Sequence, residues 1–402
     1  MIRAILLFLL LAAPAMAQDF SGLARVDPAR SLVSDQGTGV RLALGLSQPV
    51  PYRVFTLDNP RRLVVDFREV DWTGITRDAL LNSDNVSDLG YGPLRPGWSR
   101  LVLVLDGPMR VTEAGMAVSE ETGTADLTLL LEPTSDEAFA ATSGTPEGTG
   151  WGDLDLALSA DVPPPASDGP LVIVIDPGHG GIDPGAVRGD LIEADLMLRL
   201  AFEVADALNR VDGIRAVLTR EANDFVPLSA RITAARSVGA DLFISLHADA
   251  LEEDEARGAS VYTLSDEAED RASQRMAERH ERGDLLAGLD LNGQEDRVAT
   301  VLMDLARRET APKSERFADA LALALQETGA VLNSRPRREG PLAVLNAADF
   351  PSVLLEAGFL SSDDDRARLS TPEGRAPIVT AIVRAVQRWA TDEAVRAPLV
   401  RQ

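Results

Sequence analysis

Between residues 25 and 133, hydrophobic residues recur at every second position, which is the period of a β-strand with one buried face. The clearest runs place apolar side chains at Val40, Leu42, Leu44 and Leu46, and again at Leu63, Val65 and Phe67. The alternate positions of the second run hold Arg62, Val64 and Asp66. Turn-forming segments such as "DNPRR" and "YGPLRPG" separate the runs. The pattern predicts a small all-β sandwich whose strands each bury one face.

From residue 171 onward, the hydrophobic period switches between that of a strand and that of a helix. The apolar "LVIVID" at 171–176, "RAVLTR" and "DLFISLHAD" predict strands, and helical patterns lie between them. The helix expected at 193–209 has one apolar face, formed by Leu196, Leu200, Val204 and Leu208. A last helix carries one apolar stripe, formed by Ile378, Ala381, Ile382, Ala385, Val386 and Trp389. This alternation predicts an α/β domain at residues 171–395, with a mostly parallel sheet flanked by helices.

Two segments interrupt these domains or precede them. Residues 134–170, with "TSDEAFAATSGTPEGTG" and "ADVPPPASDGP", hold too little apolar surface to form a core, so we expect a flexible linker after a β domain at 18–133. Residues 1–17 place one arginine before a short apolar stretch and end in "AMA", as a cleaved signal peptide does. About ten apolar residues are too few to cross a bilayer core of roughly 30 Å. We therefore expect an exported protein with no transmembrane anchor in its mature chain.

Composition narrows the classes of function. The 402 residues carry a formal net charge of -24 and show no basic stripe, which argues against a nucleic-acid partner. The chain has no cysteine, so an exported form has no disulfides, and any metal site must use histidine, aspartate or glutamate. Only three histidines are present, and one of them lies in the glycine-rich stretch "IVIDPGHGGIDPGA" directly after a predicted strand.

Four candidate site residues fall at strand or helix ends. His179 follows the first predicted strand of the α/β domain, His247 and Glu356 end two later strands, and Glu193 opens a helix. Singly, each histidine is more often a core residue than a ligand, and Glu193 could be an ordinary acid of a first helical turn. Because parallel strands end at one edge of a sheet, we expect the four side chains to meet. Two imidazoles and a carboxylate form a hydrolytic zinc shell, and a further carboxylate supplies a general base.

The ordered motifs of this region carry a family resemblance. "VIVIDPGHGGIDPGAV", "EADLMLRLA", "LTREANDFVPLSARITAAR", "ADLFISLHADA" and "PLAVLNAADFPSVLLEAGFLSSDDD" resemble those of a zinc-dependent N-acetylmuramoyl-L-alanine amidase of the amidase_3 class. The segment "GVRLALGLSQPVPYRVFTLDNPRRLVVDFREV" resembles an AMIN domain, so the whole chain is similar to AmiB/AmiC-like amidases. The resemblance implies one Zn²⁺ held by His179, Glu193 and His247, with Glu356 as the catalytic glutamate.

The resemblance also implies a substrate, a compartment and partners. The substrate is peptidoglycan, cleaved between N-acetylmuramic acid and L-alanine for wall remodelling and daughter-cell separation. The compartment is the periplasm of a Gram-negative bacterium, with enrichment at the division site through the AMIN-like domain. A LytM-domain activator of the EnvC/NlpD type is the expected protein partner. A zinc peptidase or deacetylase acting on the wall, and a non-catalytic wall-binding protein, remain the alternatives.

Other residues are expected to support the metal site, and two positions near the ligands depart from the family pattern. We expect Asp176, Asp183 and Arg231 to orient ligands or to close loops without a catalytic role. The usual lysine after the glutamate ligand is Ala194 here, and the usual asparagine of His-Ala-Asn is Asp249. Neither change removes a ligand, so only contacts with the substrate are affected.

Residues 265–310 are longer and more charged than the connection that a compact amidase domain needs. An apolar stripe at helical spacing within them packs on the main domain in the simplest interpretation. The resemblance implies more, because division amidases of this family carry here a helix that covers the zinc cleft until an activator displaces it. We therefore expect a regulatory insertion, with His280, Glu278 or Glu281 as the autoinhibitory plug.

Overall fold

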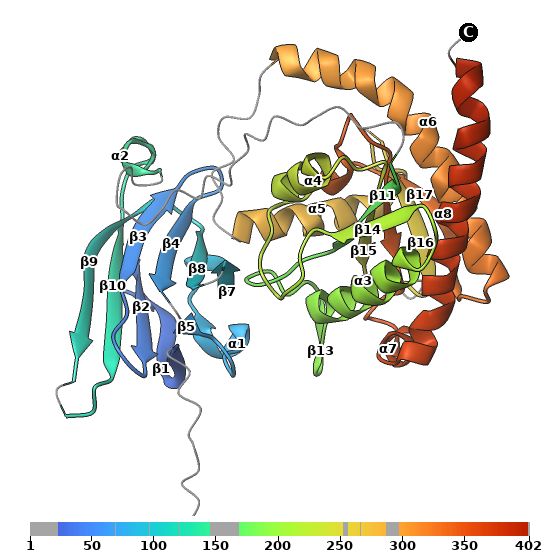
Figure 1. Cartoon of the computed structure of the whole chain (residues 1–402). Helices are drawn as coiled ribbons and strands as arrows, with labels where there is room; N and C mark the ends of the chain where they lie inside the picture. The colour runs from blue at the N-terminus through green and yellow to red at the C-terminus, as the bar shows by residue number, and fades with distance from the viewer. Residues whose placement is uncertain are drawn as a thin grey trace, which may run out of the picture.

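The computed structural model describes residues 23–144, 169–251, 256–286 and 297–400, apart from positions 69, 96, 120 and 266. The expected signal peptide and residues 145–168 of the expected linker lie outside the described residues. Two domains lie side by side (Figure 1), an N-terminal domain of β-strands and a C-terminal domain in which helices surround a sheet. Within the described ranges, no helix combines the length and the apolar character that a membrane span requires.

The N-terminal domain is a sandwich of two sheets, as expected. One sheet has the order β5 (Val70–Asp71), β1 (Ala24–Gln36), β2 (Gly39–Leu46), β10 (Ala125–Pro133) and β9 (Met109–Val118), and β6 (Leu81–Asn82) also pairs with β1. The other has the order β3 (Tyr52–Leu57), β4 (Arg62–Arg68), β8 (Trp98–Leu105) and β7 (Val86–Arg95). A short helix α1 (Arg77–Leu80) precedes β6. The expected apolar positions of β2 and β4 fill the core between the sheets.

The expectation of one buried face per strand was wrong for β4. Leu63, Val65 and Phe67 face the core, but Val64 and Asp66 on the opposite face are fully buried as well. The reason is a second apolar cluster that joins this outer face to the C-terminal domain. Its members are Phe55, Leu57, Val64, Leu94, Trp98, Val102, Ile182 and Phe225.

Part of the expected linker is helical instead. Residues Asp136–Thr142 form α2, which begins at the side-chain cap of Ser135, whose hydroxyl accepts a hydrogen bond from the backbone N–H of Ala138. Phe139 of α2 is 1 % exposed and packs in the sandwich core. One buried aromatic residue is enough to fix a short helix on the sheet, which the polar composition of the segment conceals.

The C-terminal domain is built on a mostly parallel sheet, as expected. Its strand order is β14 (Ile214–Leu218), β11 (Leu171–Pro177), β15 (Leu242–His247), β18 (Ser352–Glu356), β16 (Ala259–Leu264) and β17 (Leu332–Gly340). The first four strands are parallel, whereas β16 runs antiparallel to β18 and parallel to β17. Between β11 and the next helix, β12 (Val187–Arg188) and β13 (Leu191–Ile192) form a short hairpin.

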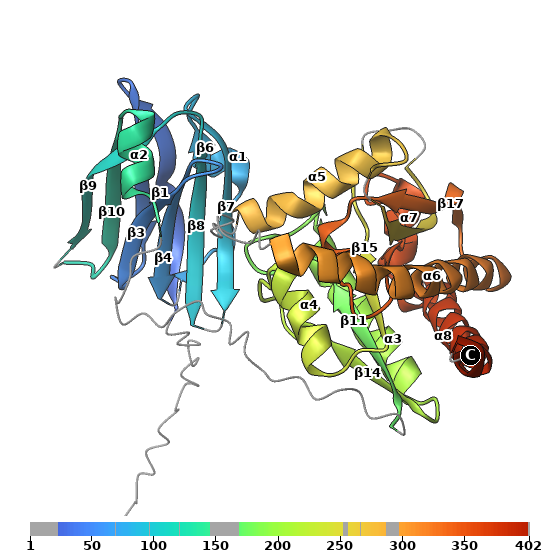
Figure 2. The same cartoon turned by 90° about the horizontal axis from the view of Figure 1, so that it is seen from above.

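Helices cover both faces of this sheet (Figure 2). The apolar faces of α3 (Glu193–Asn209), α6 (Arg297–Glu327) and α8 (Pro372–Val400) share one core with the strands. On the other face, α4 (Leu228–Ser237), α5 (Arg271–Leu286) and the 3₁₀ helix η1 (Ala343–Leu345) contribute to a second core. The helix α7 (Asp363–Leu369) precedes α8. The expected insertion therefore contains α5 and the first part of α6, which continues without a break into the domain core.

Candidate metal centre

His179 lies in the loop after β11 with a backbone φ of +58°, the left-handed region that non-glycine residues rarely adopt. Its Nδ1 lies 2.7 Å from the Asp183 carboxylate, within hydrogen-bond distance. Its Nε2 lies 3.2 Å from Glu193 Oε1 but makes no hydrogen bond among the described residues. A carboxylate that holds one ring nitrogen while the other faces a polar group is the usual support of a metal-binding histidine.

Glu193 joins the two histidines that sequence analysis selected. Its Oε1 lies 3.2 Å from His179 Nε2 and 3.2 Å from His247 Nδ1, and the carboxylate accepts backbone N–H groups of Ala186 and Ala248. Burial raises the pKa of this carboxyl, but the neighbouring imidazoles outweigh burial and hold the pKa well below its usual range. A buried, ionised carboxylate between two imidazole rings is a suitable set of metal ligands.

Two glycines allow the ligands to approach this closely. A Cβ on Gly178 would lie 2.3 Å from the ring of His247, and a Cβ on Gly185 would lie 2.6 Å from the ring of His179. Both distances are far below van der Waals contact, so any larger residue would displace a histidine. The glycine-rich motif "DPGHGGIDPGA" is therefore a requirement of packing around the site.

Glu356 lies beside His247 because the two residues are direct partners in the pairing of β15 with β18. Its Oε2 accepts the backbone N–H of Asp249 at 3.0 Å, while its Oε1 has no hydrogen-bond partner among the described residues. Burial, followed by the charges of Asp249 and Glu193, raises the pKa of the fully buried Glu356 carboxyl well above its usual range. A buried carboxyl with a raised pKa is the kind of group that general acid–base catalysis uses.

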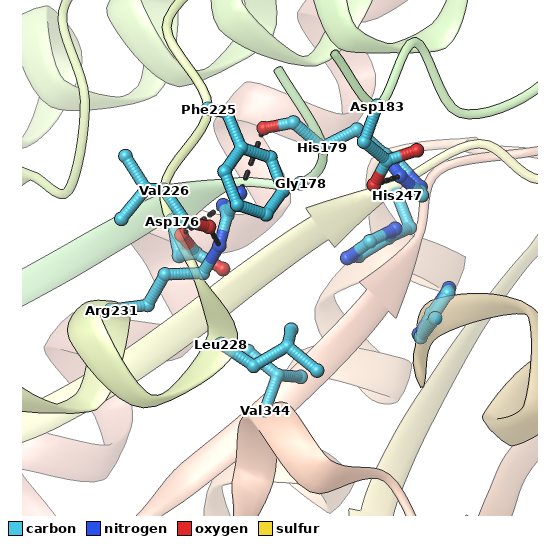
Figure 3. A pocket seen from close by; sticks show the side chains of 11 residues that line it. Asp176, Gly178, His179, Asp183, Phe225, Val226, Leu228, Arg231, His247 and Val344 are labelled. Atoms are coloured by element: carbon cyan, nitrogen blue, oxygen red, sulfur yellow. Dashed lines mark hydrogen bonds and ion pairs between the residues drawn. The ribbon is translucent and has the colours of Figure 1, made fainter. Parts of the chain in front are cut away.

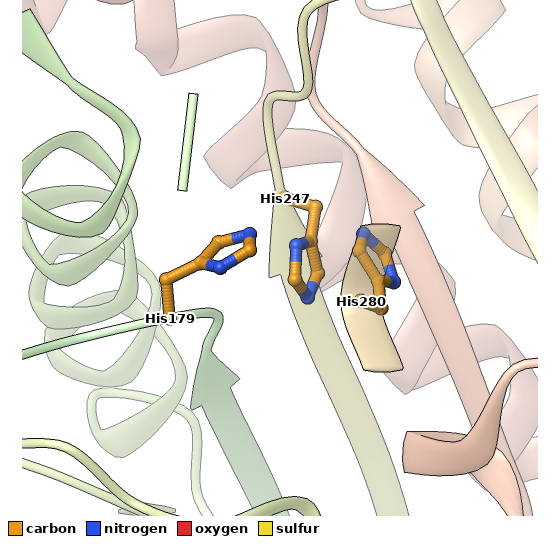
Figure 4. A group of neighbouring side chains, drawn as sticks. All are labelled: His179, His247 and His280. Carbon is orange, nitrogen blue, oxygen red and sulfur yellow. The ribbon is translucent and has the colours of Figure 1, made fainter. Parts of the chain in front are cut away.

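The third histidine, His280, reaches the same place from α5 (Figure 4). Its ring stacks on that of His247 with centroids 4.1 Å apart, and the ring of His179 is 5.8 Å away. Ligand atoms of the three histidines lie within 4.8 Å of one another, and His280 forms a second such group with Asp249 and Glu356. Burial, and then the charges of the other two histidines, lowers the pKa of His280 well below its usual value. The ring is therefore neutral at pH 7 and keeps a free lone pair.

The other two plug candidates are not seen beside the histidines. Glu278 is exposed, and its carboxylate accepts a hydrogen bond from Gln274 one helical turn earlier. The side chain of Glu281 lies outside the described residues. Only His280 of the three is therefore seen beside the candidate ligands.

Sequence reasoning missed an ion pair that ties α5 to the site. Arg279 Nη1 donates to Asp249 Oδ1 at 2.7 Å, and the Asp249 carboxylate is fully buried. Asp249 Oδ2 lies 3.8 Å from His280 Nε2. The signal was present in the sequence, because Asp249 replaces the usual asparagine and Arg279 precedes His280. Their pairing depends on where α5 packs, which the sequence pattern does not give.

Of the residues expected to support the site, Asp183 contacts the His179 ring, whereas Asp176 and Arg231 lie together near the backbone of the loop (Figure 3). Arg231 pairs with the buried Asp176 at 2.8 Å and donates a hydrogen bond to the carbonyl of His179 at 2.8 Å. Arg220, which sequence reasoning also missed, donates to the carbonyl of Gly178 at 2.9 Å. The guanidinium groups thus fix the unusual backbone of the loop. A pocket beside His179 and His247 is also lined by Arg231, Phe225 and His280.

The sequence matches two protein families and is similar to several known proteins. The Amidase_3 family, described as N-acetylmuramoyl-L-alanine amidase, matches residues 173–388, and the AMIN domain family matches residues 32–126. The chain is 30 % identical over 370 residues to the N-acetylmuramoyl-L-alanine amidase AmiC of Neisseria meningitidis, covering 88 % of this chain and 87 % of the relative. It is 36 % identical over 222 residues to AmiA of Escherichia coli, covering 55 % and 76 % of the two chains. Among solved structures, AmiC2 of Nostoc punctiforme is 26 % identical with a TM-score of 0.40, covering 56 % of this chain and 98 % of that chain.

Proposed function

Because the chain belongs to the Amidase_3 family of N-acetylmuramoyl-L-alanine amidases, we propose that it cleaves the amide between N-acetylmuramic acid and L-alanine with one zinc ion. His179, Glu193 and His247 would hold the ion. The observation that carries the proposal is the shared Glu193 Oε1, which lies 3.2 Å from a nitrogen of each histidine. Beside it, His179 Nε2 makes no hydrogen bond to any residue that the structure describes. Two nitrogens and one carboxylate oxygen are a common hydrolytic zinc set.

The described residues can carry the proton transfers of the reaction. A zinc ion held by these residues would supply a water of lowered pKa and polarise the substrate carbonyl. Glu356, whose Oε1 has no hydrogen-bond partner in the described part of the chain and whose pKa is raised, accepts the proton of the attacking water. The same carboxyl then donates that proton to the nitrogen of the leaving alanine. The backbone N–H of Asp249, bound to Glu356 Oε2, keeps the carboxyl in place between these steps.

Metal analysis tests the ligand set directly. His247→Ala removes one of two imidazole ligands, so we expect the purified variant to retain far less zinc than the unaltered chain by mass spectrometry of its metals. Circular dichroism checks that the variant is still folded. Stoichiometric zinc in the double variant His179→Ala/His247→Ala would contradict the assignment. Release of stem peptides with a free lactyl carboxylate, instead of free sugar amine or cleaved peptide, distinguishes an amidase from a deacetylase or peptidase.

The same proposal includes an autoinhibited state, with α5 as the inhibitory helix and His280 as its plug. His280 lies within reach of the zinc ligands and of Glu356, so it fills the space that a scissile amide needs. Its neutral ring would be available as a further ligand to a bound zinc ion and would exclude water from the site. The Arg279–Asp249 ion pair, one residue away, holds this part of α5 against the site.

Point variants on α5 test the plug. His280→Ala should raise basal activity toward purified sacculi about tenfold or more, because it removes one ligand without changing the catalytic residues. Glu278→Ala is the matched control, since Glu278 is exposed on the same helix. Deletion of residues 266–308 should give the largest activation and remove any need for an activator. No gain in a folded, zinc-loaded deletion variant would refute autoinhibition.

Cellular role and targeting complete the proposal. Export through a signal peptide at 1–17 brings the chain to the periplasm, and the AMIN domain, assigned to residues 18–133, directs it to the wall at the division site. A LytM-domain activator displaces α5 there, so that wall cleavage accompanies daughter-cell separation. Fluorescent fusions with and without residues 18–133 test the targeting, since only the complete chain should gather at septa.

A further inference from the structure

The AMIN domain contacts the catalytic domain at the loop that carries His179. The carbonyl of Pro93, in β7, accepts a hydrogen bond from the backbone N–H of Ile182 at 3.1 Å. Ile182 is 1 % exposed and packs in the interdomain cluster with Leu94, Trp98 and Phe225. The two backbones are so close that a Cβ on Gly181 would lie 2.2 Å from the Pro93 oxygen.

This contact is linked through a single residue to a proposed zinc ligand. Ile182 is followed by Asp183, whose carboxylate binds His179 Nδ1. A tight turn fixes the segment, because Gly180 and Asp183 exchange backbone hydrogen bonds of 2.7 and 3.1 Å. Phe225 belongs to the interdomain cluster and also lines the pocket beside His179 (Figure 3). The AMIN domain thus packs against the back of the metal centre.

The AMIN domain also meets the inhibitory helix. One end of α5 points at β7 and β8 (Figure 2), and α5 and β8 are in contact. Farther along α5, Arg279 and His280 contact Asp249 and the two other histidines. A helix held at both places must lose its contact with β8 before it can move away as a rigid body.

We propose that the AMIN domain is an inhibitory clamp, which docks β7 and β8 on the His179 loop and on α5 and so stabilises the closed position of α5. The inference rests on the proposed autoinhibition by α5. It gives the AMIN domain a second task beside targeting, because events that undock the domain would favour release of the helix. Undocking need not alter the catalytic residues, since none of them belongs to the AMIN domain.

The test uses the full mature chain with Leu94→Asp, and Val118→Asp as the matched control. Leu94 is 3 % exposed within the interface, whereas Val118 is 50 % exposed at the end of β9 in the other sheet. A buried leucine contributes enough to weaken docking about tenfold or more when it becomes charged. We expect faster hydrogen exchange of α5 and of residues 179–183, and higher basal activity, only in Leu94→Asp. Exchange equal to that of the control, or faster exchange with lower activity, would overturn the clamp.

A second measurement does not depend on activity or on the fold of a charged variant. Because the chain has no cysteine, Leu94→Cys introduces a single thiol whose labelling rate reports undocking. Coupling is reciprocal, so deletion of residues 266–308 should speed labelling of that thiol, while a Val118→Cys thiol should react at the same rate in both backgrounds. Unchanged labelling of Leu94→Cys would refute the coupling. Failure of autoinhibition itself is distinguishable, because the deletion would then leave basal activity unchanged.

Discussion

The two domains each bury a cluster of charged side chains, and the clusters differ in how completely their polar atoms are satisfied. In the AMIN domain, both oxygens of the fully buried Asp66 bind guanidinium groups, with Arg100 at 2.5 and 3.0 Å and Arg53 at 2.7 Å. In the catalytic domain, Glu356 Oε1 and Asp249 Oδ2 are equally buried but make no hydrogen bond among the described residues.

The difference separates a structural ion cluster from a reactive one. Buried polar atoms that lack partners are costly, so a fold keeps them only where something else uses them. The Asp66 cluster is complete within the protein and offers nothing to a ligand. The cluster around Glu193 and Glu356 keeps unpaired polar atoms among the described residues, and we propose that a metal ion and a substrate complete it. Substitutions in the two clusters should therefore affect opposite properties.

The largest expected effect is on turnover, from Glu356→Gln. The amide keeps the size of the side chain but cannot accept a proton at neutral pH, so we expect a loss in rate of about 10²-fold or more with zinc retained. Activity on sacculi and metal content are measured on the same sample. The deletion background that lacks residues 266–308, which we expect to be more active, makes a loss easier to detect. Near-normal turnover of a zinc-loaded variant would remove Glu356 from the mechanism.

The same variant should also change how stability depends on pH in the metal-free protein. The pKa of Glu356 is raised in the folded state, so its contribution to stability is present at low pH and is lost as pH rises past the usual range of a glutamate. Glutamine does not titrate, so the free energy of unfolding of Glu356→Gln should fall less over that rise in pH. Denaturant unfolding at several pH values measures this free energy for both proteins. If it depended on pH equally in the variant and in the unaltered chain, the raised pKa would be contradicted.

The second effect is on stability, from Asp66→Ala. Removing the carboxylate leaves Arg100, which is 2 % exposed, without its buried counter-charge, and breaking such a pair costs about 3–5 kcal/mol. We expect the AMIN domain to unfold at a lower denaturant concentration while the zinc content stays unchanged. The fluorescence of Trp72 and Trp98 reports the unfolding of this domain. A loss of zinc with no change in unfolding would mean that the two clusters had been assigned the wrong roles.

The two clusters were not equally predictable from the sequence. The candidate ligands could be found because each lies at the end of a strand or the start of a helix, where topology alone brings distant residues together. The Asp66 cluster could not be found in this way. In "RLVVDF", the arginine and the aspartate fall on the face opposite the apolar one, and charged residues there predict a solvated face. Its burial depends on Arg53 and Arg100, which neighbouring strands place against it, and strand periodicity carries no information about those contacts.

The helix α5 shows a finer limit of the same kind. The length and charge of residues 265–310 predicted an insertion, and α5 lies within it. Choosing among Glu278, His280 and Glu281 required the rotation of the helix about its axis, because residues so close in sequence point in different directions. The pattern of α5 alone does not set that rotation. The contact of Arg279 with Asp249 helps to set it, and this contact joins residues thirty positions apart.

The smallest expected effect is that of Gly92→Ala, at the contact between the two domains that hold these clusters. A Cβ there would lie 2.9 Å from the carbonyl oxygen of Gly181, so the AMIN domain must shift slightly away from the His179 loop. Gly144→Ala is the matched control, because its φ of +140° resembles the +152° of Gly92 while no atom of the described residues lies within 4 Å of the added carbon. Both variants should lose about 1 kcal/mol or more of stability from backbone strain. Only Gly92→Ala should speed hydrogen exchange at residues 179–183, and equal exchange in both would mean that the AMIN domain does not restrain the loop.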